Sequence, residues 1–218
     1  MNYQVEMEKI INSLDYKPRL LLHVCCAPCS SYVLSILSKY FDIDIIYYNP
    51  NINTKEEYCK RLDELKRLLN IVEYESKINI IDCNYNNKDF FNAVKGLEKE
   101  VEGGKRCYEC YKLRLDFIAQ KAKKLGYEYF TTSLSISPYK NACWLNEIGI
   151  NLEKKYGVKY LVADFKKKNG YKISIELSKK YNLYRQDYCG CIYSKIERRK
   201  KYEIKNKKNK EFEESKIN

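Results

Sequence analysis

Seven of the ten cysteines in this 218-residue chain lie in three short clusters. Cysteines so close in sequence seldom form a disulfide with each other, because the bond needs Cα atoms about 4.4–6.8 Å apart with converging side chains. Soft thiolates at such spacing suit zinc or iron–sulfur centres. The pattern predicts one metal site assembled by folding, with these candidate ligands: Cys25, Cys26, Cys29, Cys107, Cys110, Cys189 and Cys191.

The number of thiols bears on the choice of metal. A structural zinc ion takes four ligands, usually from two CxxC knuckles, so three thiols would be surplus. Seven thiolates match a [4Fe–4S] cluster held by three cysteines beside a second metal held by four. Asp187 and Glu109 are near enough in sequence to replace a thiolate at either metal.

Four residues with reactive side chains stand apart from these clusters. We expect Cys59, Cys83 and Cys143 to be ordinary buried or half-buried cysteines. His23 is the only histidine and precedes the first cluster within an apolar segment. It is either a core histidine bonded to a backbone group or a hydrogen-bond donor to a metal-bound sulfur.

Strand-like and helix-like segments alternate along the chain. Apolar runs predict strands at residues 19–24, 43–48, 78–82, 129–132 and 159–163. Helical periodicity predicts helices at residues 1–16, 30–40, 54–69, 90–101, 107–125, 141–156 and 174–180. The third helix opens with a capping pair, Thr54 and Glu57, and Gly149 interrupts the sixth. This order predicts an α/β fold in which helices flank a parallel sheet.

The expected topology places the chemistry at one edge of the sheet. Ligands of such sheets bind beyond the carboxyl ends of the strands. The first cysteine cluster follows the first strand, and a polar loop, residues 133–140, follows the strand at 129–132. We therefore expect the cysteine-rich metal site at this edge. Residues 1–194 should form a single catalytic domain, followed by a basic tail at 195–218.

The charge balance favours a polyanionic partner. The chain has 41 basic and 29 acidic residues, a formal charge of +12, and 22 tyrosines that could stack on unpaired bases. A lysine- and tyrosine-rich composition alone gives the same counts, so both interpretations stay open. Residues 195–210 hold nine basic and two acidic residues, which fits either an RNA-contacting arm or a solvated tail.

The sequence also predicts a compartment. Residues 1–17 lack the basic and apolar regions of a secretory signal, and the longest apolar run, residues 20–24, is far too short to cross a bilayer. We expect a cytoplasmic protein with no membrane contact. Thiols stay reduced in that compartment, which favours metal or redox chemistry over structural disulfides.

Five motifs between residues 20 and 194 resemble, in the same order, the epoxyqueuosine reductase QueH family. They are HVCCAPCS at 23–30, YNPNI at 48–52, EGGKRCYECY at 102–111, TTSLSISPYK at 131–140 and LYRQDYCGCIYS at 183–194. The combination is more specific than any one motif. Residues 133–136 and 141–144 look atypical of the family.

The resemblance implies a cobalamin-independent oxidoreductase with a HUP or PP-loop type of fold. Such an enzyme reduces the epoxide of epoxyqueuosine in tRNA, giving queuosine at the wobble position of GUN anticodons. It carries a [4Fe–4S] cluster beside a second iron ion and has a disulfide bond of unassigned pairing. All seven clustered cysteines become metal ligands, and Cys25, Cys26, Cys107 and Cys110 are assigned to the cofactor.

The resemblance also suggests reaction partners and roles. Deoxygenation of an epoxide consumes two electrons and two protons, which suits a one-electron donor such as ferredoxin or flavodoxin. An open iron site can act as a Lewis acid, and a side chain must donate a proton to the developing alkoxide. The candidate catalytic residues are Tyr139, Lys140, Asp187 and Tyr188. Contacts to phosphates or bases would come from Arg106, Arg114, Lys140 and Arg185, with a surface salt bridge as the alternative for each arginine.

Three other classes compete with this interpretation. A zinc-stabilised RNA-binding protein without redox activity explains the charge but leaves three thiols unused. A PP-loop tRNA thiolase needs a Gly-rich phosphate cradle, which the loop Cys-Cys-Ala-Pro-Cys-Ser lacks. A thiol–disulfide oxidoreductase needs one CxxC pair rather than three clusters.

Overall fold

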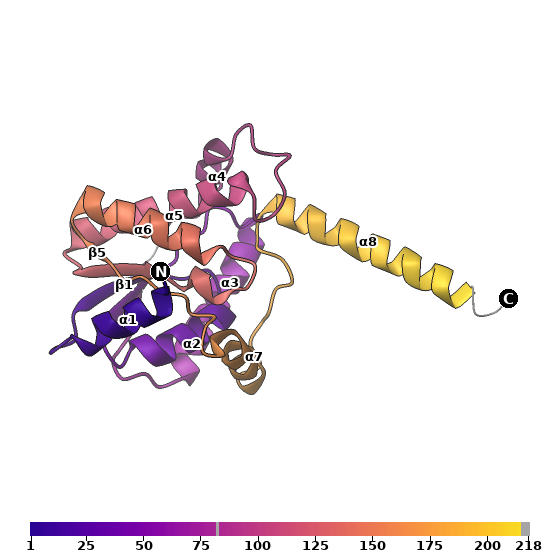
Figure 1. The fold of residues 1–218 in the computed structure, drawn as a ribbon. Coiled ribbons are helices and arrows are strands. Elements are labelled where there is room, and N and C mark those ends of the chain that lie inside the picture. The colour runs from indigo at the N-terminus through magenta and orange to yellow at the C-terminus, as the bar shows by residue number, and fades with distance from the viewer. Residues whose placement is uncertain (82, 215–218) are drawn as a thin grey trace.

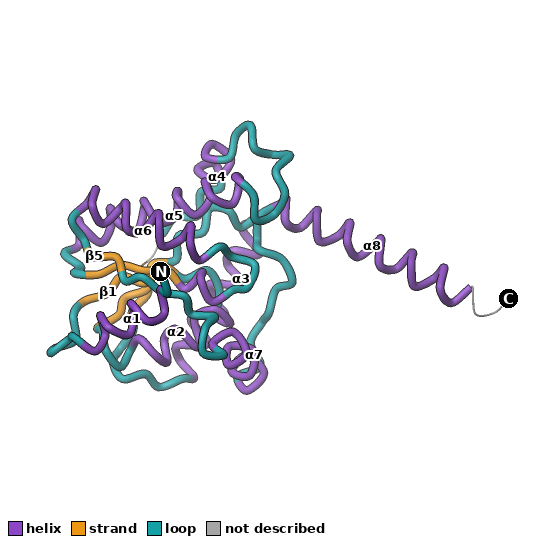
Figure 2. Tube along the Cα trace, in the orientation of Figure 1, coloured by secondary structure: helices purple, strands orange, loops and turns teal. Residues whose placement is uncertain are grey.

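A five-stranded parallel sheet forms the centre of the protein (Figures 1 and 2). The computed structural model describes residues 1–81 and 83–214, with side chains up to residue 207. The strand order is β3-β2-β1-β4-β5, and every neighbouring pair is parallel. The strands are β1 (Arg19–His23), β2 (Asp42–Ile46), β3 (Asn79–Ile81), β4 (Tyr129–Thr132) and β5 (Lys159–Tyr160). The predicted α/β fold is confirmed.

Helices cover both faces of this sheet. Apolar residues of α1 (Tyr3–Asn12), α2 (Ala27–Leu37) and α3 (Lys55–Ile71) share one core with Leu20 and Leu22 of β1. Residues of α5 (Lys105–Leu125) and α6 (Ala142–Tyr156) share a second core with Leu21 of the same strand. Alternate side chains of a strand point to opposite faces, so a strand covered on both sides must be continuously apolar. This explains the Leu-Leu-Leu run of β1.

The remaining helices lie around the edges of the two layers. They are α4 (Lys88–Ala93), a 3-10 turn η1 (Ser133–Ile136), α7 (Gly170–Lys180) and α8 (Ile192–Glu214). Figure 1 shows α8 extending away from the body of the protein. Its 23 residues span about 34 Å at 1.5 Å per residue. No helix within residues 1–81 and 83–214 is long and apolar enough to cross a membrane.

The order of the strands creates a switch point beside β1. From β1 the chain moves outward through β2 and β3, and it then returns to place β4 on the other side of β1. Ligands of open parallel sheets bind at such a reversal. The segment after β1 begins with Val24 and Cys25, and the segment after β4 is η1. These two segments converge on the pocket described below.

Several element boundaries differ from the sequence-based predictions. The helix predicted at residues 90–101 is only α4, because the chain turns at Gly96, whose φ is +84°. The strand predicted at 159–163 ends at Tyr160, since the side chain of Asn146 bonds both the N–H and the carbonyl of Ala163. The helix predicted at 174–180 begins earlier, at Gly170, and the one predicted at 30–40 spans Ala27–Leu37.

The structure also tests three further predictions about helices and strands. Gly149 does not interrupt α6; a Cβ at this position would lie 2.3 Å from the ring of Tyr160, so glycine allows β5 to approach the helix. The cap of α3 is as predicted, because the Thr54 hydroxyl accepts a hydrogen bond from the N–H of Glu57. The predicted strand at 78–82 is observed as Asn79–Ile81, and Asp82 lies outside the described residues.

Candidate metal centre

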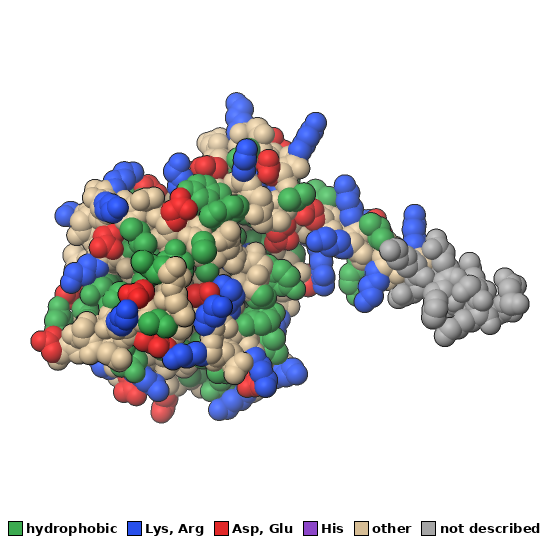
Figure 3. All heavy atoms as spheres, in the orientation of Figure 1, with side chains coloured by type: hydrophobic (Ala, Val, Ile, Leu, Met, Phe, Trp, Pro, Cys, Tyr) green, Lys and Arg blue, Asp and Glu red, His purple; other side chains and the backbone are tan. Residues whose placement is uncertain are grey.

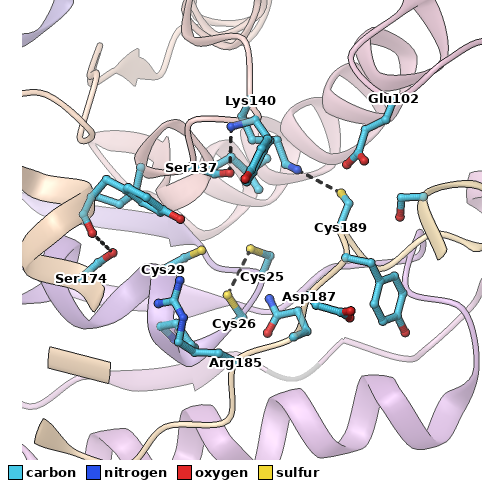
Figure 4. Close-up of a pocket in the computed structure, with 18 of the residues that line it drawn as sticks. Cys25, Cys26, Cys29, Glu102, Ser137, Lys140, Ser174, Arg185, Asp187 and Cys189 are labelled. Atoms are coloured by element: carbon cyan, nitrogen blue, oxygen red, sulfur yellow. Dashed lines mark hydrogen bonds between the residues drawn. The ribbon is translucent and has the colours of Figure 1, made fainter. Parts of the chain in front are cut away.

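The cysteines of the first cluster gather around one point at the start of α2. Cys25 comes two residues after β1, Cys26 is the N-cap of α2, and Cys29 lies in its first turn. Their three sulfur atoms lie within 4.8 Å of one another, with Cys25 and Cys26 3.8 Å apart (Figure 4). The positive end of the helix dipole favours thiolates at this place. All three line a pocket of about 340 Å³.

His23 fixes the strand that carries this cluster. Its side chain is fully buried, with Nε2 3.1 Å from the carbonyl of Tyr48 and Nδ1 2.9 Å from the hydroxyl of Thr132. Burial, aided by the charge of Arg114, lowers the pKa of His23 to about 3, so the ring is neutral. A carbonyl only accepts, so Nε2 carries the proton and the hydroxyl of Thr132 donates to Nδ1. Of the two roles open in the sequence, the structure supports the core histidine.

The other four clustered cysteines form a second group. Cys107 and Cys110 are one turn apart on α5, while Cys189 and Cys191 flank Gly190 before α8. The four thiols are close enough that the charge of one thiolate helps to raise the pKa of others in the group. Burial raises the pKa of Cys107 and Cys191, and raises that of Cys110 to about 12. The seven thiols thus divide into a compact group of three and a looser group of four.

Backbone contacts hold the loop of Cys189 and Cys191 against the body. The N–H of Asn53 donates to the carbonyl of Gly190 at 2.8 Å, and Arg61 donates to the carbonyl of Cys189 at 3.2 Å. Gly190 has φ of +127°, and a Cβ there would lie 3.1 Å from the Arg61 guanidinium. Glycine is needed at this turn both for its backbone angle and for the close approach of α3.

Three cations lie among the thiols. Arg114 is 1% exposed and Arg61 also 1%, and each has a guanidinium nitrogen without a hydrogen-bond partner. Among the described residues Arg114 has no carboxylate partner, whereas Arg61 pairs with Glu57 at 2.7 Å. The ammonium of Lys140 lies 3.1 Å from the sulfur of Cys189. Buried cations require anionic neighbours, and thiolates holding a metal supply them.

The pKa values follow this arrangement. Hydrogen bonding to Cys26 raises the pKa of Cys25 to about 12, and hydrogen bonds from Cys25 and Cys29 hold the pKa of Cys26 well below its usual value. Burial opposes ionisation of Cys189, but Lys140 and Arg114 outweigh it and lower its pKa. Clustered thiols beside these three cations, of which Arg114 has no carboxylate partner among the described residues, are a donor set that fits a soft, thiolate-bound metal centre.

The candidate catalytic residues predicted from sequence all line this pocket. Tyr139, Lys140, Asp187 and Tyr188 surround its walls. In Figure 4 the pair of Lys140 and Cys189 lies on one side of the three sulfurs and Arg185 on the other. Tyr139 is 75% exposed, and the pKa of Tyr188 is raised chiefly by burial. Glu109, in contrast, pairs with Lys112 and does not line the pocket.

Four predictions about individual side chains are corrected. Arg106 is buried and pairs with Glu197 at 3.0 Å instead of facing solvent, whereas Arg114, also buried, lines the pocket, so its predicted contact with substrate stays a prediction. Cys59 and Cys143 are exposed rather than buried, because each lies on the outer side of its helix; Cys83 is half-buried as predicted. The expected disulfide bond is not seen among the described residues.

Two site residues were missed in the sequence. Arg61 sits within a strongly amphipathic helix, where an arginine ordinarily faces solvent. Asn49 is buried and links two segments of the site. Its side-chain N–H donates to the carbonyl of Val24, and its side-chain oxygen accepts a hydrogen bond from the guanidinium of Arg114. Two signals in the sequence pointed to Asn49: its position after the second strand, at the edge where ligands bind, and its place in the YNPNI motif at 48–52.

Comparison with known proteins identifies the family. The family model described as "Epoxyqueuosine reductase QueH" matches residues 20–197. A protein of that name from Streptococcus pyogenes serotype M1 is 42% identical over 193 residues, covering 87% of this chain and 75% of its own. Those from Staphylococcus epidermidis and Thermotoga maritima are 41% and 38% identical, covering 89% and 84% of this chain and 84% and 93% of their own. The chain therefore belongs to the epoxyqueuosine reductase QueH family.

Proposed function

We propose that this protein is an epoxyqueuosine reductase, which removes the epoxide oxygen of epoxyqueuosine in tRNA and leaves queuosine at the wobble position. The observation that carries this proposal is the pocket in which three mutually adjacent thiols face four candidate catalytic side chains. Relatives named epoxyqueuosine reductase match most of the chain, which supports the same activity. The overall reaction joins the epoxide oxygen, two electrons and two protons to form an alkene and water.

The seven clustered cysteines would hold a [4Fe–4S] cluster and a second iron ion. Their division into groups of three and four supports two adjacent centres, and the buried Arg61 and Arg114 together with the half-buried Lys140 offset the negative charge of thiolate ligands. Bound there, iron supplies single electrons and a Lewis acid for the epoxide oxygen. Zinc alone would use four of the seven thiols, so the zinc-stabilised RNA-binding alternative accounts for less of the site.

Protein side chains would manage the protons. Burial works to lower the pKa of Lys140, but Cys189 and Tyr111 outweigh it, so the pKa rises and Nζ keeps its proton. That ammonium stabilises an oxyanion developing in the pocket. Tyr139 is the most exposed of the candidates and can approach the bound epoxide as a proton donor. Tyr188 and Asp187 border the opening, where they position the substrate.

The proposed substrate also sets the partners. A base in an anticodon loop can leave the stack and enter a pocket, which a base inside a duplex does only at greater cost. Arg185 at the pocket wall is available for a phosphate or a base edge. We place residues 1–194 as the catalytic domain and 195–218 as a basic tail, and expect a ferredoxin- or flavodoxin-type electron donor in the cytoplasm.

Anaerobic purification followed by metal analysis and an activity assay tests this proposal. We expect iron and acid-labile sulfide in the protein, a broad absorption band near about 400 nm, and loss of one oxygen from epoxyqueuosine in tRNA when a low-potential one-electron reductant is added. Nucleoside mass spectrometry detects that loss. One zinc ion per chain with no sulfide and no conversion would refute the reductase and leave the zinc-stabilised RNA-binding protein.

A further inference from the structure

A second cleft adjoins the reaction pocket at the root of α8. Its volume is about 510 Å³, and Asp187, Tyr188 and Arg198 line both it and the pocket. The remaining walls come from α8, including Lys195, Arg199 and Tyr202. The proposed reaction uses only the pocket, and it assigns no role to the part of the cleft that α8 forms.

The cleft combines aromatic faces with positive charge. Tyr202 is 58% exposed, and its ring lies 6.0 Å from the guanidinium of Arg198; the ammonium of Lys195 lies 5.9 Å from the ring of Tyr188. Arg198 pairs with Asp187 at 3.6 Å and Arg199 with Glu203 at 3.1 Å. Exposed pairs of this kind are worth about 1 kcal/mol or less, so phosphate can displace the carboxylates. Lys195 has no ion pair within the described part of the chain.

The helix that forms most of the cleft, α8, contributes little to the hydrophobic core. From residue 192 to 207 α8 has no residue buried beyond its first turn, and Figure 3 shows basic side chains along its length. Seven basic and two acidic residues lie between 195 and 207. Beyond its first turn α8 carries mostly basic and polar side chains, with Ile196, Tyr202 and Ile204 exposed among them. A basic helix that projects from the body is suited to meet an external partner of opposite charge.

We propose that this cleft binds an unpaired nucleotide next to the modified one, with its base stacked on Tyr202 and its phosphates at Lys195 and Arg199. Stacking on tyrosine beside a basic groove is how proteins hold single-stranded RNA. The shared wall with the reaction pocket means that one nucleotide enters the pocket while its neighbour occupies the cleft. This inference rests on the proposed function, because it takes the anticodon loop of tRNA as the substrate.

Binding of a synthetic GUN anticodon stem-loop tests the cleft without requiring the reaction. The full-length, anaerobically purified protein is titrated against labelled RNA, comparing wild type with Tyr202→Ala. We expect the dissociation constant to rise about 5- to 150-fold, the range for loss of one base–aromatic stack. Replacing Lys200 and Lys207 with alanine is the matched control, since these lysines are on α8 but do not line the cleft.

A double-mutant cycle locates the stacked base. An abasic site on one side of the wobble position should weaken binding to wild type but add little to Tyr202→Ala. If wild type binds and reduces tRNA while Tyr202→Ala binds the stem-loop equally well, the cleft is refuted and the reductase stands. A wild-type protein that does not bind the stem-loop but binds anionic phospholipid vesicles would overturn both the nucleotide-binding cleft and the proposed reductase function.

Discussion

At the scale of single residues, the unusual feature is a buried arginine that faces sulfur rather than carboxylate. Arg114 donates to the carbonyl of Cys110 and to the side-chain oxygen of Asn49, and its guanidinium lies 5.9 Å from the ring of Tyr111. Within the described part of the chain, one of its terminal nitrogens has no hydrogen-bond partner. In metal-free protein this charge is a cost, so Arg114→Met should leave the free energy of unfolding unchanged or raise it by about 1–4 kcal/mol. In metal-loaded protein the same change should reduce the iron retained.

Chemical denaturation with and without a chelator, together with iron analysis, separates these effects. Lys155→Met is the control, because this lysine forms an exposed pair with Asp116 and its loss should change stability by less than about 1 kcal/mol. An Arg114→Met protein that unfolds more easily without metal yet keeps its iron would contradict the assigned role.

A second prediction at the scale of single residues concerns Gly190. Alanine at this φ of +127° and beside Arg61 should lower the free energy of unfolding by about 1–3 kcal/mol and displace the two flanking thiols. Gly96→Ala is the matched control, since its φ is +84° but no atom lies within 4 Å of the added Cβ. Both variants should melt earlier, and only Gly190→Ala should lose iron. Equal iron in the two would contradict this prediction.

At the scale of elements, His23 ties three strands together at the edge that carries the site. It bonds the segment after β2 through Tyr48 and the end of β4 through Thr132. His23→Phe should destabilise the fold by about 1–3 kcal/mol for each buried group left unpaired. It should also reduce metal content, because the cysteine loop begins two residues later.

Thr131→Val is the comparison for His23→Phe. It removes one buried hydrogen bond of the neighbouring strand β4, in which the Thr131 hydroxyl donates to the carbonyl of Leu161 at 2.8 Å, and Thr131 does not line the cysteine pocket. We expect a loss of stability without loss of iron, measured by urea denaturation and metal analysis. Iron loss in both variants would show that metal content follows stability rather than the strand junction.

At the scale of the whole molecule, charge is concentrated where α8 leaves the body. If Lys195 and Arg199 contact phosphates, replacing both with alanine should reduce the slope of log affinity against log salt by about 1.4, at about 0.7 for each contact to single-stranded RNA. The alanine double variant of Lys200 and Lys207 should keep the wild-type slope. Binding measured at several salt concentrations checks this, and equal slopes in all three proteins would exclude phosphate contacts at the cleft.

The sequence alone determined the fold class and the candidate metal ligands, but not the geometry of the site. Apolar runs and helical periodicity predicted five strands in an α/β sheet, because burial on both faces leaves a continuous apolar signature. Cysteine spacing singled out the candidate ligands, since few other roles place seven thiols in three such short clusters. Boundaries at β5 and α4 were missed because they depend on Asn146 and on the backbone of Gly96.

Only the tertiary structure decided which side chains face the thiols. Arg61 and Arg114 look like surface arginines in their helices, and burial against residues far away in sequence turns them into neighbours of the cysteines. The division of seven thiols into three and four likewise depends on how α2, α5 and the loop before α8 meet. Local sequence encodes periodicity and residue chemistry, whereas long-range packing sets burial and electrostatic environment.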